Sequence, residues 1–285
     1  MKKLKVVTIV GTRPEIIRLS ALIPKLDKFT DHVLVHTGQN SDPNLFDVFF
    51  KDLELRKPDY YLDVDTSSMG RVIGETIKKS EELFRAVLPD AVVILGDTNS
   101  AVSALVSERL HIPVYHLEAG NRSFDSNVPE ELNRKMIDHV SSFNLPYNSY
   151  SWSNLIAEGI HPRRMSKTGS PMREVLNRNL ISITNSTVLD RLGLTRSNYF
   201  VSSFHRQENV DNSARLSSLI GNLNQLAEKF RLPIIVSTHP RTRIRLSELG
   251  IETSELIQFR APLGFHDYCQ LQLNSACVLS DSGTL

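Results

Sequence analysis

Two glutamates between His116 and Arg134 lie on consecutive elements of an expected α/β unit, which makes them candidate acid and base catalysts. Glu118 directly follows an apolar run that should form a strand. Glu130 follows Pro129, and proline suits the first turn of a helix. The helix dipole alone also favours an acidic side chain at a helix start, so a purely structural role for Glu130 is the competing interpretation. The segment predicts a strand that ends at one carboxylate and a helix that begins at another.

Other polar residues follow the remaining apolar runs, at positions where strands should end. Ligands of open parallel sheets bind at the carboxyl ends of the strands, so these residues are the candidates for a site. They lie in Gly11-Thr-Arg-Pro-Glu15, Thr37-Gly-Gln-Asn40, Gly96-Asp-Thr98, Glu118-Ala-Gly-Asn-Arg122, Ser203-Phe-His-Arg-Gln-Glu208, Thr238-His-Pro-Arg241 and Ser280-Asp-Ser-Gly-Thr284. Asp97 could instead cap a helix, and His205 could be a structural histidine.

Phosphate binding is indicated at two of these strand ends. Ser282, Gly283 and Thr284 offer hydroxyl and backbone N–H groups, and the planar guanidinium of Arg13 suits a phosphate. The chain has neither a Walker loop nor the G-x-G-x-x-G dinucleotide fingerprint. A nucleoside diphosphate is therefore a plausible ligand, whereas a nicotinamide cofactor is not expected.

The elements that must position these residues alternate between strands and helices. The first half has short runs rich in valine and isoleucine, expected as strands at 6–10, 33–36, 91–95 and 113–117, and a clear amphipathic helix at 67–87. The second half has strands expected at 199–204, 233–238, 256–259 and 276–279, with helices at 214–229, 242–250 and 264–273. This order predicts an α/β fold with doubly wound parallel sheets in two domains, 1–170 and 171–285.

Composition excludes several classes of protein. With 33 basic and 32 acidic residues the net charge is +1, so no overall field favours nucleic acid or an anionic membrane. Two cysteines are too few for a disulfide framework, and His266 with Cys269 does not make a convincing zinc site. No metal or other cofactor is expected. Neither a signal peptide nor a membrane-spanning run is found, which predicts a soluble cytoplasmic protein.

Taken together, the motifs resemble the non-hydrolysing UDP-N-acetylglucosamine 2-epimerase family. The motifs occur in the order and spacing of the family, and they span essentially the whole chain. The resemblance rests on Gly11-Thr-Arg-Pro-Glu15, Thr37-Gly-Gln39, Gly96-Asp-Thr98, His116-x-Glu-Ala-Gly120, Pro129-Glu-Glu-x-Asn-Arg134, Thr168-Gly-Ser-Pro171, His205-Arg206 and Ser280-Asp-Ser-Gly283.

The resemblance implies two Rossmann-like domains facing a cleft that binds a UDP-sugar, as in B-type glycosyltransferases. It also implies elimination of UDP to a 2-acetamidoglycal, followed by re-addition of UDP with C2 inverted. Asp97, Glu118 and Glu130 are then the acid and base candidates, with the roles of the carboxylates unassigned, and His205 would assist departure of the diphosphate. The expected ligand-binding residues are Arg13, Arg122, Arg206, Ser282, Gly283 and Thr284. Family members are commonly homodimers, which is the expected assembly.

Four positions depart from the common family pattern: Arg18 replaces lysine, Asn40 replaces histidine, Asn121 replaces leucine and Thr284 replaces glycine. The combination of Glu118-Ala-Gly-Asn-Arg122, Phe124-Asp125 and Ser280-Asp-Ser-Gly-Thr284 resembles the branch that converts UDP-2-acetamido-2,6-dideoxy-L-talose to UDP-N-acetyl-L-fucosamine for surface polysaccharides. This sugar is favoured over UDP-N-acetylglucosamine, which stays the alternative. The residue at position 40 argues against a second, regulatory UDP-sugar site.

The chain stops at Leu285, just after the expected phosphate-binding turn, where the family continues with further strands and helices. The second domain is therefore expected to be incomplete. Two other hypotheses follow: a truncated remnant that binds UDP-sugar without turnover, and a B-type glycosyltransferase. The cluster of carboxylates argues against the glycosyltransferase.

Overall fold

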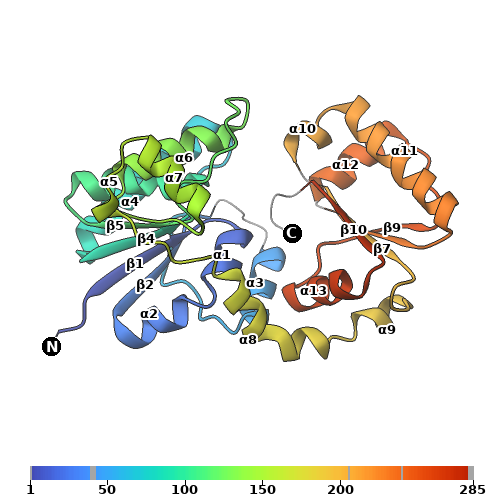
Figure 1. Ribbon diagram of the computed structural model, residues 1–285, viewed down its shortest axis with the longest axis horizontal. Helices are drawn as coiled ribbons and strands as arrows, with labels where there is room; N and C mark the ends of the chain where they lie inside the picture. The colour runs from blue at the N-terminus through green and yellow to red at the C-terminus, as the bar shows by residue number, and fades with distance from the viewer. Residues whose placement is uncertain (1, 39–42, 205, 239, 282–285) are drawn as a thin grey trace. The chain divides into compact units, whose positions relative to one another are not determined.

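The computed structural model describes residues 2–38, 43–204, 206–238 and 240–281 and divides the chain into two compact units (Figure 1). Unit 1 is Met1–Arg178 and unit 2 is Asn179–Leu285. The division lies within helix α8 (Met172–Thr184), whereas the sequence places the domain boundary in the preceding loop near residue 170. Among the described residues, no helix has both the length and the apolar character needed to cross a membrane.

Unit 1 is built on a six-stranded sheet with the order β3-β2-β1-β4-β5-β6, and every pair of neighbouring strands is parallel. The strands are β1 (Lys5–Val10), β2 (Asp31–His36), β3 (Tyr60–Tyr61), β4 (Ala91–Leu95), β5 (Val114–Leu117) and β6 (Phe143–Leu145). The sequence predicts the four central strands and misses the short edge strands β3 and β6. An edge strand is paired on one side only and needs no continuous apolar run.

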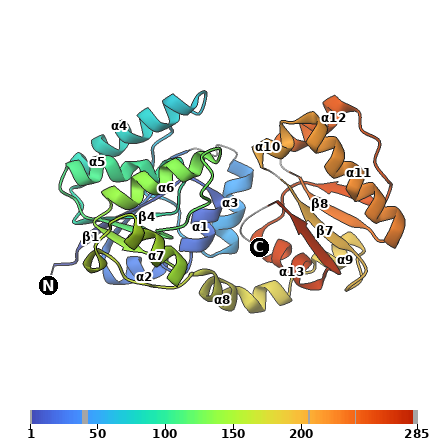
Figure 2. The ribbon, with the colours of Figure 1, turned by 45° about the horizontal axis from the view of Figure 1, so that its top comes forward.

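Helices cover both faces of this sheet. They are α1 (Arg13–Leu19), α2 (Ile23–Phe29), α3 (Pro43–Asp52), α4 (Met69–Val87), α5 (Ser103–Arg109), α6 (Pro129–Val140), α7 (Ser149–Ala157) and the start of α8, with short 3-10 turns η1 (Asn99–Val102) and η2 (Pro162–Arg164). In both ribbon views α4 and α5 lie on one face and α2 lies on the other (Figure 2). Phe84 and Ala104 pack on the strands of the first face.

The long helix α4 forms where the sequence predicts it. Ser68 caps its start by accepting a hydrogen bond from the backbone N–H of Arg71 at 3.3 Å. Leu88 ends it in the left-handed conformation, just before Pro89. The helix buries Val72, Thr76, Ser80, Leu83, Phe84 and Val87, which share one face. This face anchors the helix on the sheet and leaves the strand ends accessible to the loops that carry the polar motifs.

Unit 2 has a four-stranded parallel sheet with the order β10-β7-β8-β9. Its strands are β7 (Phe200–Ser203), β8 (Ile234–Ser237), β9 (Ile257–Arg260) and β10 (Cys277–Ser280), and its helices are α9 (Val188–Leu192), α10 (Gln207–Val210), α11 (Ser213–Phe230), α12 (Pro240–Leu249) and α13 (Phe265–Asn274). Phe200 packs with residues of α11 on one face, whereas Val201 packs with α9 and α13 on the other (Figure 1). Both units are therefore α/β layers with parallel sheets, as predicted.

Candidate active site

The candidate site of unit 1 lies at the carboxyl ends of adjacent strands. Strands β1, β4, β5 and β6 are neighbours, so the loops that follow them meet at one edge of the sheet. Backbone hydrogen bonds continue past the strands: Gly96 N–H donates to Leu117 O at 3.0 Å, and Glu118 N–H donates to Leu145 O at 3.2 Å. These bonds fix the loops of Asp97 and Glu118 side by side.

Glu118 lies in an unusual backbone conformation with φ of 68°. This left-handed region is rare for residues with a Cβ, and such strain is concentrated at functional sites. Its side chain is only 14% exposed, and one carboxylate oxygen, Oε2, accepts a hydrogen bond from Nη1 of Arg18. The other oxygen, Oε1, accepts from Asn121 Nδ2 at 3.1 Å. The carboxylate is thus held by one charged and one neutral donor.

The surroundings of Glu118 raise its pKa. Burial is the main cause, because it penalises the charged form; Arg18 counteracts it in part, and the charge of Asp97 raises the pKa further. The Glu118 carboxylate therefore binds a proton more readily than a surface glutamate does. A raised pKa suits a carboxylate that must take up a proton during a reaction.

Asp97 is held by Arg134, which comes from the second turn of α6. Nε and Nη2 of the guanidinium lie 2.7 and 2.6 Å from the same oxygen, Oδ2, of Asp97. Asn133 also donates to the backbone carbonyl of Asp97 at 2.9 Å. Thr98, not Asp97, occupies the N-cap position of η1. The helix-cap interpretation of Asp97 is therefore wrong, and its carboxylate belongs to an ion pair at the strand end.

The two acidic residues at the start of α6 have different environments. Glu131 is buried and accepts hydrogen bonds from Ser123 and Phe124 backbone N–H groups at 2.9 and 3.3 Å. Glu130 is exposed in the first turn of the helix. Within the described residues, no hydrogen bond joins Glu130 to Asp97 or Glu118. Glu131 thus orders the loop after Glu118, a role that the sequence did not identify.

The Glu118 loop rests on a buried charged cluster. His116 lies with Nε2 2.8 Å from Gly96 O and Nδ1 2.9 Å from Asp138 Oδ1. A carbonyl and a carboxylate can only accept hydrogen bonds, so these two neighbours favour the protonated form of the ring. Burial alone lowers the pKa of His116, but the hydrogen bond and charge of Asp138 raise it overall. The His116–Asp138 pair therefore connects β5 with α6 two residues before Glu118.

Arg122 belongs to the same cluster, whereas the sequence predicts that it binds the UDP-sugar. Its side chain is 0% exposed, and it pairs with Asp138 at 2.8 Å and with Glu158 at 2.5 Å. It also donates to the backbone carbonyl of Asn121 at 2.7 Å. These contacts lie within unit 1, so Arg122 shapes the loop that follows Glu118, and its role in binding the UDP-sugar stays a prediction.

The first loop is organised by a buried carboxylate, Glu15. Its Oε2 accepts from the backbone N–H groups of Gly11 and Thr12 at 3.0 and 2.7 Å, and its Oε1 accepts from the Ser100 hydroxyl. Glu15 therefore connects the loop after β1 with the turn after β4. Arg13 directly follows this loop as the first residue of α1, with its guanidinium 5.8 Å from the ring centre of Phe49, and burial lowers its pKa.

In unit 2 the structure brings two of the predicted segments together. The backbone N–H of Arg206 and the side-chain amide of Asn209 both donate to Oδ2 of Asp281 at 3.0 Å. Arg206 is exposed. His205, Ser282, Gly283 and Thr284, as well as Asn40, lie outside the described residues. Asp281 thus connects the segment after β7 with the segment after β10, its neighbour in the sheet.

Comparison with known proteins decides the family. Residues 25–285 match the family model described as UDP-N-acetylglucosamine 2-epimerase. The chain belongs to this family. It is therefore an isomerase, and the family that its motifs resemble is confirmed.

Several relatives of the epimerase family match nearly the whole chain. The UDP-N-acetylglucosamine 2-epimerase of Methanocaldococcus jannaschii is 35% identical over 98% of this chain and 79% of its own length. Its crystal structure in complex with UDP-GlcNAc and UDP has a TM-score of 0.92 over the same shares of the two chains. A Rickettsia bellii UDP-N-acetylglucosamine 2-epimerase structure is 44% identical, with a TM-score of 0.87, covering 99% of this chain and 75% of that chain.

One relative in the epimerase family is named for a different sugar. The UDP-2,3-diacetamido-2,3-dideoxy-D-glucuronate 2-epimerase of Pseudomonas aeruginosa is 33% identical, and the match covers 98% of this chain and 78% of that protein. Similar chains thus carry names with different UDP-sugars. The family alone does not decide the sugar of this epimerase.

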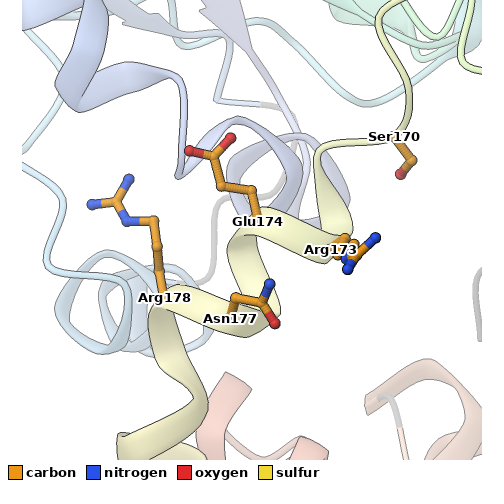
Figure 3. A pocket seen from close by; sticks show the side chains of 5 residues that line it. All are labelled: Ser170, Arg173, Glu174, Asn177 and Arg178. Atoms are coloured by element: carbon orange, nitrogen blue, oxygen red, sulfur yellow. The ribbon is translucent and has the colours of Figure 1, made fainter.

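A surface pocket of the epimerase chain lies elsewhere in unit 1. It is lined by Ser170, Arg173, Glu174, Asn177 and Arg178, all on α8 or directly before it (Figure 3). Glu174 pairs with Lys25 of α2 at 2.6 Å, and Arg178 donates to the carbonyl of Ala21 at 3.3 Å. These contacts fasten α8 to the turn between α1 and α2. The pocket shares no residue with the strand-end site, and its contacts are structural.

Proposed function

We propose that this epimerase inverts C2 of a UDP-2-acetamido sugar by eliminating and re-adding UDP. The observation that carries the proposal is the environment of Glu118. It is a mostly buried carboxylate with a raised pKa, beside Asp97, at the carboxyl ends of β4 and β5. The C2 proton of a sugar is weakly acidic, so its removal needs a positioned base whose proton affinity is high enough.

In the proposed reaction the ionised Glu118 takes the C2 proton. The electron pair of the C2–H bond forms the C1–C2 double bond, and the C1–O bond to UDP breaks with its electrons on the diphosphate. The products of this half-reaction are a 2-acetamidoglycal and UDP. In the second half, UDP oxygen adds back to C1 while a proton is delivered to the opposite face of C2.

Asp97 and Glu130 remain the candidates for the second proton-transfer group. Arg134 fixes the orientation of the Asp97 carboxylate by binding Oδ2, and Oδ1 takes no part in that ion pair. Glu130 is exposed, so it would have to approach the sugar from the start of α6. Arg13, His205, Arg206 and the segment 282–284 are proposed to bind the diphosphate, where positive charge and N–H donors stabilise the leaving group.

For the sugar we propose UDP-2-acetamido-2,6-dideoxy-L-talose, with UDP-N-acetyl-L-fucosamine as product for surface polysaccharide synthesis. Asn121, Phe124 and Asp125 support it, and Asn121 directly contacts Glu118. UDP-N-acetylglucosamine, the sugar in the names of most relatives above, is the second candidate.

The test is proton exchange at C2 in D2O, followed by NMR for both UDP-sugars. The proposal predicts that deuterium enters C2 and that the inverted epimer accumulates, faster with the L-talose derivative. Binding of UDP without exchange would support a binding protein and overturn the proposal. Sugar transfer to an acceptor without C2 exchange would instead indicate a glycosyltransferase.

A further inference from the structure

We propose that Asn121 and Ser151 are positioning residues that orient the Glu118 carboxylate for proton transfer at C2. This inference rests on the proposed function, because that function assigns removal of the C2 proton to Glu118. It goes beyond that function because neither residue is among the acid, base or diphosphate-binding groups.

Asn121 has both ends of its side-chain amide engaged. Nδ2 donates to Glu118 Oε1 at 3.1 Å, and Oδ1 accepts from the Ser151 hydroxyl at 2.8 Å. An ionised carboxylate can only accept hydrogen bonds, so the NH2 side of the amide must face Glu118. The Ser151 hydroxyl, by donating to the opposite end, holds the amide in this orientation.

Ser151 is itself fixed in the first turn of α7. It is 3% exposed, and its backbone N–H donates to the N-cap residue Asn148 at 2.9 Å. The loop approaches this turn closely: a Cβ placed on Gly120 would lie 2.2 Å from the Ser151 carbonyl oxygen. Gly120 also has φ of 79°, which favours glycine. The start of α7 therefore supports Asn121 as a rigid element.

The result is a carboxylate with one donor on each oxygen. Arg18 binds Oε2 and Asn121 binds Oε1, which fixes the plane of the Glu118 carboxylate. A carboxylate has about four lone-pair positions, so each oxygen keeps a position for a proton. Leucine at position 121 could not donate, and Oε1 would then be free to rotate away.

The experiment measures the titration of Glu118 by NMR with glutamate labelled at the side-chain carboxyl carbon. Its signal is identified by its loss in Glu118→Gln. Asn121→Leu removes the donor to the charged form and should raise the pKa of Glu118. Asn121→Asp keeps the side-chain shape but adds a negative charge, and should raise this pKa further. Asn127→Leu, on the exposed part of the same loop, is the matched control and should leave it unchanged.

A second readout separates positioning from packing. In Asn121→Leu the acidic limb of the C2 exchange rate should move to higher pH together with the Glu118 titration. Ser151→Ala, which frees the amide to turn, should produce a smaller shift in the same direction. If Asn121→Leu does not fold, the isosteric Asn121→Asp and Ser151→Ala report on the same contact.

A Glu118 titration that stays unchanged in the Asn121 and Ser151 variants overturns the positioning role. Failure of the proposed function would look different. In that case the wild-type protein shows no C2 exchange, while the NMR titration still reports whether Asn121 acts on Glu118.

Discussion

Arg134 uses two nitrogens of its guanidinium to bind a single oxygen of Asp97, at 2.7 and 2.6 Å. This contact joins the second turn of α6 to the end of β4 and fixes the direction of the Asp97 carboxylate. Lysine cannot reproduce it, because an ammonium is a compact point charge without the planar pair of donors.

Arg134→Lys should therefore lower the C2 exchange rate about tenfold or more. Stability should change by less than about 1 kcal/mol, because the ion pair is partly exposed to solvent. Steady-state exchange kinetics and chemical denaturation measure the two effects. Arg85→Lys, in an exposed pair with Glu81 on α4, is the control and should change neither. A wild-type rate of C2 exchange in Arg134→Lys would contradict a catalytic role for the two-nitrogen contact between Arg134 and Asp97.

The pair formed by Arg18 and Glu118 predicts a pH effect. Burial raises the pKa of Glu118, and the charge of Arg18 opposes that rise. Arg18→Met should raise the pKa further, because the carboxylate loses a nearby positive charge. Since Glu118 must be ionised to accept the C2 proton, activity is lost as the pH falls through this pKa.

The acidic limb of the pH–rate profile should therefore shift to higher pH in Arg18→Met. Arg18→Lys, which keeps the charge, should retain most of the wild-type profile. The profiles are measured as C2 exchange under saturating UDP-sugar. An acidic limb that moves to lower pH, or one that is the same in all three proteins, would argue that Glu118 is not the base.

The buried position of Arg122 leads to a prediction about stability. Arg122→Met leaves Asp138 and Glu158 without their shared partner, and breaking a buried pair in this way costs about 3–5 kcal/mol. The free energy of unfolding from chemical denaturation measures the loss. Arg85→Met, at the exposed surface of α4, should cost about 0.5 kcal/mol or less. Unchanged stability with weakened UDP binding would contradict this structural role and support the predicted role of Arg122 in ligand binding.

The sequence locates the central strands and the ends at which Asp97 and Glu118 lie. Buried parallel strands need continuous apolar runs, and the residues after them are easily found. The edge strands β3 and β6 have no such run. The sequence predicts helix α4 because its apolar face follows the helical period over its full length.

The ion-pair partners could not be predicted from spacing. Arg18 and Glu118 are 100 positions apart, and only the pairing of the strands brings helix α1 and the loop after β5 together. The ion pairs of Arg122 could not be predicted from spacing for the same reason. Its place beside Glu118 in the sequence suggests a ligand-binding residue, but folding brings Asp138 and Glu158 to its guanidinium. Arg134 was part of the recognised motif, yet its partner Asp97 lies in another loop.

The central claim is that Glu118 moves the C2 proton, and its most direct test is Glu118→Gln in D2O. The amide keeps the shape of the side chain but cannot accept the proton. Deuterium incorporation at C2 should fall by about a hundredfold or more. Binding of UDP, measured by calorimetry, should be retained. Asp97→Asn should likewise lose C2 exchange and retain UDP binding. Glu81→Gln, on the exposed surface of α4, should exchange at the wild-type rate. Wild-type exchange in Glu118→Gln would contradict the mechanism.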